Sequence, residues 1–171
     1  MSGLTMIHNW FPDPYLTKRL VKPALENAET MFWNTPFRMM FVETSVDGFA
    51  AATYSVSGLP VGMDLTFAAN IDTGNSTKDF APLLVANSSF GFIAQSSSVH
   101  DIAMKMHVSF AVPSDGVVKL RFCAPPVGGE SCTFSRVILT ESASWDLVDG
   151  LVPTHVQGGV FGYDLMPITK D

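Results

Sequence analysis

The sequence predicts an all-β protein, an antiparallel β-sandwich of two sheets with extended segments at both ends. From Arg38 onward, turn signals recur about every ten residues, as they do when short strands follow one another. Several segments between the turns alternate apolar and polar residues, which is typical of a sheet with one buried face. No long segment has the period of a helix. We expect a core sandwich over 38–148, an N-terminal arm with a first strand over 1–37, and an extended C-terminal tail over 149–171.

The first core strands are indicated by their alternation. An apolar strand is predicted at 38–45, and a tight Asp-Gly turn follows it. Residues 49–57 then place Tyr54 and every second neighbour on one face, and residues 63–71 alternate in the same way. The Gly-Leu-Pro-Val-Gly segment at 58–62 separates these two strands, so we expect a hairpin here.

The rest of the core follows the same pattern. Loops are predicted at 72–79, 96–101 and 125–131, and strands at 82–87, 90–95, 102–113, 117–124 and 132–141. Only Tyr15–Trp33 could hold a helical turn, and Pro23 would interrupt it. The tail is rich in glycine and proline, with room for one edge strand near Val160–Leu165.

Composition and charge limit the classes of function. Hydrophobic residues make up 47% of the chain and charged residues 15%, which excludes intrinsic disorder. No apolar run approaches the ~20 residues of a membrane span. The stretch MSGLTMIHNWFPDP lacks the features of a secretory signal, so we expect folding in a cytoplasm. The net charge is −6 and the densest basic cluster, Lys18, Arg19 and Lys22, is short, so nucleic acid is not an expected partner.

Four motifs occur together and in order. They are NWFPDPYL at 9–16, YSVSGLPVGMDLTFAANI at 54–71, VSFAVPSDGVVKLRF at 108–122 and CTFSRVILTESASWDL at 132–147. Over Asn9–Leu147 the chain therefore resembles the jelly-roll, galactose-binding-like domains of carbohydrate-binding modules. Such modules are common in bacteriophage virion proteins, particularly minor tail proteins, and they also accompany glycoside hydrolases.

The resemblance departs from the calcium-binding members of that family at two places. In those members a Glu follows the opening motif, and an Asp precedes the Val-x-Leu run of the last strand. This chain has Leu16 at the first place, and Ser135 and Arg136 before Val137 at the second. A buried arginine would repel a calcium ion, which needs anionic oxygen ligands. We therefore expect no metal site and no cofactor.

The resemblance favours a non-catalytic structural protein of a bacteriophage virion, a minor tail or other particle-surface protein assembled in the host cytoplasm. Its expected partners are other virion proteins and itself, as a homo-oligomer that docks through the apolar ends 1–36 and 149–171. Two alternatives stay open. One is a glycan-binding module for host attachment, with a site lined by loops 72–79, 95–101 and 124–131; the other is a capsid decoration protein.

The candidate ligand-binding residues are aromatic, because sugars stack their C–H faces on exposed rings. They lie outside the clearest alternating strands: Trp10, Trp33, Trp145 and Tyr163, and with them Phe11 and Tyr15. For Trp10 and Trp33 the favoured alternative is that they cap the bottom of the sandwich. For Trp145 and Tyr163 it is a contact between subunits.

No catalytic arrangement is predicted, so we do not expect an enzyme. The carboxylates sit at turns and polar strand faces, and no spacing selects the pair that a glycosidase needs. Cys123 and Cys132 flank one loop and form either a possible disulfide, worth roughly 2–3 kcal/mol, or two reduced thiols. Met104 and Met106 share the apolar face of their strand and are expected to fill the core, whereas His107 faces solvent.

Overall fold

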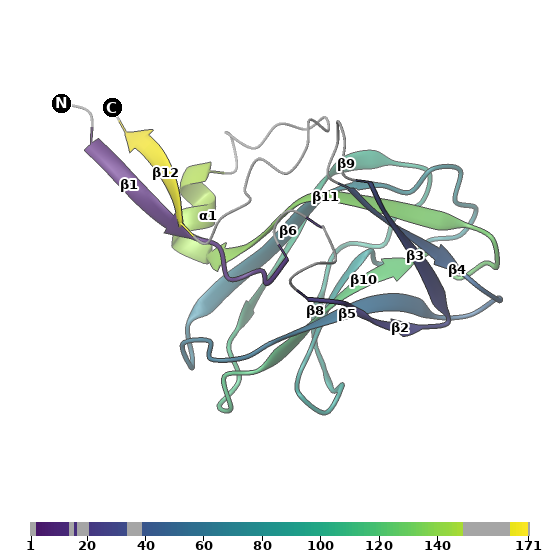
Figure 1. The fold of residues 1–171 in the computed structure, drawn as a ribbon, viewed down its shortest axis with the longest axis horizontal. Coiled ribbons are helices and arrows are strands. Elements are labelled where there is room, and N and C mark those ends of the chain that lie inside the picture. The colour runs from purple at the N-terminus through teal and green to yellow at the C-terminus, as the bar shows by residue number, and fades with distance from the viewer. Residues whose placement is uncertain (1–2, 14–15, 17–20, 34–38, 149–164, 171) are drawn as a thin grey trace.

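Two five-stranded antiparallel sheets form the sandwich that the sequence predicts (Figure 1). The computed structural model describes residues 3–13, 16, 21–33, 39–148 and 165–170. In spatial order, the first sheet holds β2 (Ala24–Glu26), β5 (Ala50–Val56), β10 (Val118–Ala124), β7 (Leu83–Ala86) and β8 (Phe92–Gln95). The second holds β3 (Ala28–Trp33), β4 (Met39–Thr44), β11 (Ser131–Glu141), β6 (Asp64–Asp72) and β9 (Ala103–Ala111). Outside these sheets, β1 (Gly3–His8) pairs with β12 (Leu165–Lys170).

Strands that follow one another in the sequence often lie in different sheets. The hairpin predicted over 49–71 is wrong, because β5 pairs with β2 and β10 whereas β6 pairs with β9 and β11. β9 and β10 are divided between the sheets in the same way. Alternation shows which face of a strand is buried, but it does not show which of two sheets the strand joins.

In the segment that could hold a helical turn, residues 24–26 and 28–33 form strands instead. β2 and β3 form an outer strand of the first and the second sheet, so the N-terminal arm supplies one edge of each. Between them, Asn27 adopts a left-handed φ of 49°. Its side-chain amide donates hydrogen bonds to the carbonyl oxygens of Val46 (2.8 Å) and Phe49 (3.1 Å), which fixes the crossing.

The C-terminal part of the described chain adds elements that sequence reasoning did not place. The helix α1 (Ser142–Val148) follows β11 where only the end of a strand was expected. The predicted edge strand near Val160–Leu165 lies outside the described residues except for Leu165, where β12 begins. Among the described residues, no helix is long and apolar enough to span a membrane.

The core lies between the sheets and is centred on Phe122 of β10. Its ring makes edge-to-face contacts, at centroid distances of 4.9, 5.2, 5.7 and 5.7 Å, with Phe134, Phe67, Tyr54 and Phe11. All five side chains are fully buried. They come from both sheets and from the N-terminal segment, so one aromatic cluster joins all three parts of the molecule.

Asn9 fixes the N-terminal segment to β11. Its Oδ1 accepts hydrogen bonds from the amides of Leu139 (3.0 Å) and Phe11 (3.0 Å), and its Nδ2 donates to the carbonyl of Val137 (3.3 Å). The neighbouring bulge of β11 contains Arg136, which has a left-handed φ of 51°. Arg136 is buried, as the sequence argument requires, and this burial lowers the pKa of its guanidinium.

Candidate functional site

The central strand of the first sheet presents two cations on its outward side. Along β10, Leu120 and Phe122 point into the core, whereas Lys119 and Arg121 alternate with them and face outward. We call this outward side the β10 face; its defining residues are Phe49, Phe90, Phe92, Lys119 and Arg121.

A row of side chains crosses the β10 face at Lys119. Lys119 lies opposite Ser55 on β5 and Ala86 on β7, and Ala86 lies opposite Phe92 on β8. Because neighbouring strands lie ~4.8 Å apart, the strands of Lys119 and Phe92 are about 10 Å apart. Ala86 lies between them and is fully covered by its neighbours, so the row presents an ammonium group and an exposed aromatic ring on either side of a buried position.

A second row crosses the face at Arg121 and holds this side chain firmly. Arg121 lies opposite Thr53 and Leu84, and Leu84 lies opposite Gln95. The Nε of Arg121 donates a hydrogen bond to the Thr53 hydroxyl (3.2 Å), and its guanidinium pairs with the Glu26 carboxylate. Arg121 is only 8% exposed, so it is a fixed part of the surface.

Two phenylalanine rings contact these cations. The guanidinium of Arg121 lies 4.6 Å from the ring centre of Phe49 and 5.2 Å from that of Phe90. The Lys119 ammonium lies 4.7 Å from the centre of the Phe90 ring. Cation–π contacts of this kind contribute roughly 0.5–1 kcal/mol each at exposed sites. Phe49 and Phe90 are thus held in place, yet they remain 45% and 53% exposed, and Phe92 on the same face is 65% exposed.

Phe90 is placed by a strained turn between β7 and β8. Its φ is +64°, a conformation that costs a bulky side chain about 1–3 kcal/mol and that is enriched at functional sites. The Asn87 side-chain oxygen accepts hydrogen bonds from the amides of Ser89 (2.9 Å) and Gly91 (2.8 Å). A Cβ at position 91 would lie 2.5 Å from the Asn87 side-chain nitrogen, so a larger residue there would displace the Asn87 side chain that holds the turn. The surrounding turn therefore forces Phe90 to project over the β10 face.

A depression of about 200 Å³ adjoins the β10 face at the Cys123 end of β10. It is mainly apolar, and Phe49, Leu84 and Gln95 contribute to its wall. The face thus combines exposed rings, hydroxyl and amide groups, cations and a shallow hollow.

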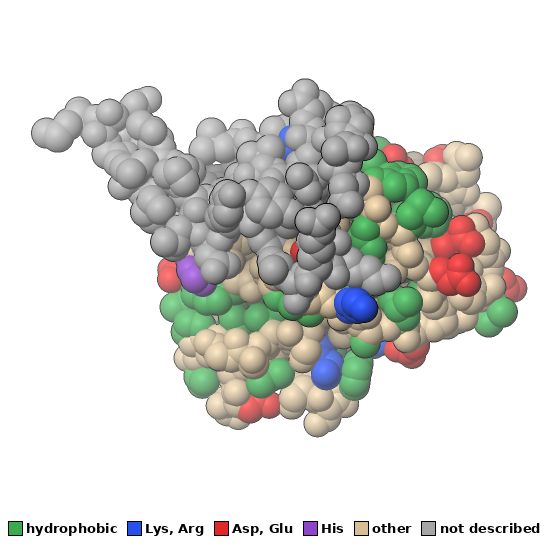
Figure 2. Space-filling view, in the orientation of Figure 1, with side chains coloured by type: hydrophobic (Ala, Val, Ile, Leu, Met, Phe, Trp, Pro, Cys, Tyr) green, Lys and Arg blue, Asp and Glu red, His purple; other side chains and the backbone are tan. Residues whose placement is uncertain are grey.

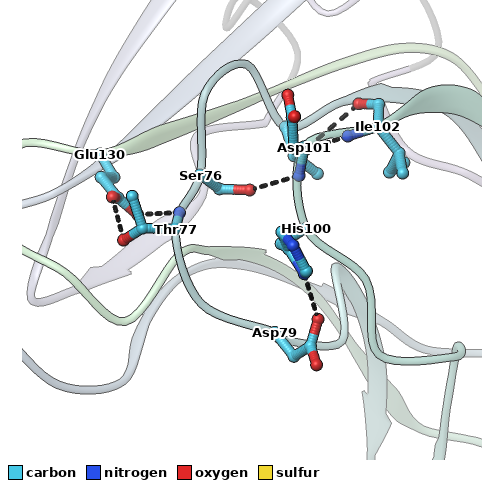
Figure 3. Close-up of polar contacts among 8 residues, drawn as sticks. Ser76, Thr77, Asp79, His100, Asp101, Ile102 and Glu130 are labelled. Atoms are coloured by element: carbon cyan, nitrogen blue, oxygen red, sulfur yellow. Dashed lines mark hydrogen bonds and ion pairs between the residues drawn. The ribbon is translucent and has the colours of Figure 1, made fainter.

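The three loops proposed for a glycan site also meet, at one end of the sandwich (Figure 3). The Ser76 hydroxyl accepts a hydrogen bond from the amide of Asp101 (2.9 Å), which joins the first loop to the second. The Thr77 hydroxyl (2.6 Å) and amide (3.2 Å) donate to the two oxygens of the Glu130 carboxylate, which joins the first loop to the third. A polar hollow of about 210 Å³ between the first and third loops has no aromatic lining among the described residues.

His100 and Asp79 form a further contact in this loop cluster. Their Nδ1 and Oδ1 atoms lie 2.5 Å apart, and both side chains are exposed. The hydrogen bond between His100 and the Asp79 carboxylate raises the pKa of His100. Polar groups here mainly satisfy one another, so the cluster is better suited to holding the loops together than to stacking a sugar.

The two predicted tryptophans of the N-terminal arm have different surroundings. Trp10 is half-buried and packs partly against the core, with its ring 4.3 Å from that of His8. Trp33 of β3 is 40% exposed, and its ring lies 6.0 Å from that of Phe41 on β4. Within the described residues, neither ring contacts the other or the rings of the β10 face.

Trp33 belongs to a smaller aromatic patch along β3 and β4. Its Nε1 donates to the sulfur of Met31 (2.9 Å), which is 52% exposed. In the same patch Glu29 lies opposite Glu43, which places two like charges side by side. Figure 2 shows acidic and hydrophobic side chains next to each other over these strands. This patch is the alternative site on the molecule.

The other predicted aromatics that the structure describes, Phe11 and Trp145, do not present an exposed ring. Trp145 of α1 is 4% exposed and packs within the chain, with its ring centre 5.9 Å from that of His107 and 5.7 Å from the Lys105 ammonium. His107 is exposed, as expected. Tyr163 and Tyr15 lie outside the described residues.

The two cysteines are free and buried. Cys123 lies on β10 and Cys132 on β11, in opposite sheets, and the structure contains no disulfide between them. Burial raises the pKa of Cys123 to about 12 and that of Cys132 well above its ordinary value. Met106 is buried as expected, but Met104 is 47% exposed because it lies on the edge strand β9.

The phenylalanines of the β10 face were not among the predicted site residues. The sequence predicts a short strand for the segment with Phe90 and Phe92 and places Phe49 in an alternating one. One usable signal was present in the sequence. Lys119 and Arg121 alternate with core residues, and this alternation already places two cations on one outward face.

No protein-family model matches this sequence, and no curated protein matches it. Solved structures do match. The second N-terminal cellulose-binding domain of Cellulomonas fimi β-1,4-glucanase C has a TM-score of 0.55 at 18% identity, over 80% of this chain and 95% of that one. The CBM22-1 xylan-binding domain of Paenibacillus barcinonensis Xyn10C has a TM-score of 0.56 at 4% identity, over 82% and 95%. The fold is that of carbohydrate-binding modules.

A third match is part of a larger protein. The Clostridium thermocellum xylanase 10B fragment with CBM22-1 and GH10 modules, complexed with xylohexaose, has a TM-score of 0.54 at 12% identity. The match covers 80% of this chain and 28% of that one. At these identities the likeness shows a shared fold alone.

Proposed function

We propose that this protein binds a carbohydrate on the β10 face. The observation that carries the proposal is the set of three exposed phenylalanines around two outward cations, on a sandwich with the fold of carbohydrate-binding modules. Exposed rings accept the C–H faces of sugars, and flanking polar groups fix orientation through the sugar hydroxyls. The cellulose- and xylan-binding domains with this fold support the same class of ligand.

The polar groups of the face match the needs of a pyranose ring. The Ser55 hydroxyl and the Gln95 amide can donate to and accept from sugar hydroxyls, and Lys119 can donate. A sugar stacked on the exposed Phe92 ring would have Gln95 on the same strand and Lys119 and Ser55 across the sheet.

We expect binding without turnover. Glu26 is the carboxylate that contacts the cations of this face, and it is paired with Arg121. A glycosidase needs two acids on either side of the glycosidic bond. Release of reducing ends from a bound polysaccharide would contradict a purely binding role.

A shallow face buries little of a sugar, so one copy is expected to bind weakly. Display in several copies would raise the avidity without any new contact. The homo-oligomer, the location in a virion and the other virion proteins as partners stay predictions, and multivalent attachment to a cell-surface glycan is compatible with all three.

The test compares two single substitutions on a glycan array and by titration calorimetry. Phe92→Ala removes an exposed ring of the β10 face and should lower affinity at least about five-fold, since an aromatic contact contributes ~1 kcal/mol. Trp33→Ala removes the exposed ring of the β3–β4 patch and should leave affinity unchanged. Loss of binding in the Trp33 variant alone would place the site on that patch, and absence of glycan binding by the parent protein would overturn the function.

A further inference from the structure

The two cations of the β10 face differ in how far their charge is already neutralised. Arg121 pairs with the Glu26 carboxylate and bonds to the Thr53 hydroxyl. Lys119 has only the Ser55 hydroxyl, at 3.5 Å, and the Phe90 ring. Among the described residues, no carboxylate lies within ion-pair distance of the Lys119 ammonium. One positive charge on this face is therefore uncompensated.

A second acid, Asp115, contacts the turn that carries Phe90. It accepts a hydrogen bond from the Ser88 hydroxyl (2.8 Å) and one from the Val117 amide (3.1 Å). These two bonds lower the pKa of Asp115. The carboxylate keeps its negative charge, but it forms no ion pair with Lys119 among the described residues.

We infer that the sugar bound on the β10 face carries a carboxylate, and that Lys119 receives it; this rests on the proposed carbohydrate binding. A sugar stacked on the exposed Phe92 ring lies on the same face as the Lys119 ammonium, and the strands that carry the two side chains are about 10 Å apart. A uronate presents an apolar C–H face to such a ring and an anionic group to Lys119. A charge-assisted hydrogen bond there is about twice as strong as a neutral one.

Because the protein is negatively charged overall, a preference for an acidic sugar has to come from a positive group close to the ligand. At −6 the chain as a whole repels a polyanion, so long-range attraction does not assist binding. The Debye length is about 8 Å at physiological salt, so only a group close to the ligand acts without strong screening. Binding of an acidic glycan should therefore depend on Lys119 and not on lysines elsewhere.

The experiment uses polygalacturonate and alginate, each compared with the same polymer after chemical reduction of its carboxylates. We expect tighter binding of the acidic form, by about ten-fold, and a loss of this preference in Lys119→Met. Lys119→Arg should keep most of it. Lys78→Met is the matched control. Lys78 is exposed in loop 72–79, so this substitution removes the same charge at a position away from the β10 face.

The outcomes separate the inference from the proposed function. Equal binding of acidic and reduced polymers, binding of neutral glycans alone, or equal losses in the Lys119 and Lys78 variants would overturn the carboxylate inference and leave carbohydrate binding intact. Failure of the parent protein on every acidic and neutral glycan would overturn the proposed function itself. Urea unfolding of each variant checks that the fold is retained.

Discussion

Phe92 and Phe122 lie on the two faces of the first sheet, so truncating each to alanine tests the division between binding face and core. Phe122 is fully buried and contacts four other rings, whereas Phe92 is 65% exposed. The chemical change is the same at both positions. Only the surroundings differ. The difference between the two variants in stability and in glycan affinity therefore measures what each ring contributes to the core and to the binding face.

The expected magnitudes follow from these surroundings. Truncating a buried phenylalanine to alanine costs about 3–5 kcal/mol, and the upper half of that range applies here because the four neighbouring rings come from separate elements and cannot all collapse into the cavity. With a urea m-value of ~2 kcal/mol/M, the unfolding midpoint of Phe122→Ala should fall by about 2 M. An exposed site usually changes stability by less than ~0.5 kcal/mol, so the midpoint of Phe92→Ala should move by less than about 0.25 M.

The assay is urea unfolding followed by circular dichroism, with glycan binding measured on the folded variants. If Phe122→Ala does not fold, Phe122→Leu replaces it, and a loss of about 1–1.5 kcal/mol is expected. Equal midpoint shifts for the two alanine variants would refute the assignment of inward and outward faces. A stable Phe92 variant with unchanged glycan affinity would refute the role of the β10 face.

Three further predictions concern the loop cluster, the thiols and the N-terminal segment. Because Asp79 raises the pKa of His100 above 6.5, their contact should stabilise the fold below that pH and fade as the pH rises through the raised value; an NMR titration checks this, with Asp79→Asn returning the pKa toward normal. Cys123 and Cys132 should react with a thiol reagent at pH 8 only after unfolding, because burial raises both pKa values, and rapid labelling of the native protein would contradict this. Asn9→Ala should cost about 2–4 kcal/mol in urea unfolding, since three backbone groups lose their partner, and an unchanged midpoint would show that they are satisfied otherwise.

The strands themselves were predictable because one buried face imposes a period of two on each. The predicted strand at 63–71 is observed as β6, Asp64–Asp72, and that at 117–124 as β10, Val118–Ala124. Tyr54 and its alternate neighbours face the core as the pattern requires. Local physics is enough for these features, because the pattern depends on burial of one face and not on the partner strand.

The pairing of strands was not predictable from the same pattern. Both sheets bury one face, so a strand of either sheet shows the same alternation. Cys123 and Cys132 illustrate the consequence, since they flank a short loop yet lie in opposite sheets. A short loop between strands permits either a hairpin or a crossing between layers, and the choice depends on contacts that are distant in the sequence.

The candidate site could not be predicted because the sequence does not distinguish an exposed phenylalanine from a buried one. Phe90 lies in the turn before β8, and Phe92 begins that strand, which has only four residues, too few for a clear period. The left-handed φ of Phe90 then turns its ring over the face. Sequence reasoning chose tryptophans because they stood outside the strands, and Trp145 proved to be buried by its own chain.

The two outward cations of β10 have different roles: the contacts of Arg121 support the face, and Lys119 is the proposed contact for the ligand. Arg121 is nearly buried, and a carboxylate, a hydroxyl and two rings fix it, so its contacts hold Phe49 and Phe90 in position. Lys119, two residues away, keeps an uncompensated charge beside one of those rings. A surface on which both cations were paired would be inert, and one on which neither was paired would leave its rings unsupported. The unequal pairing is what makes the β10 face both ordered before binding and open to an anionic group.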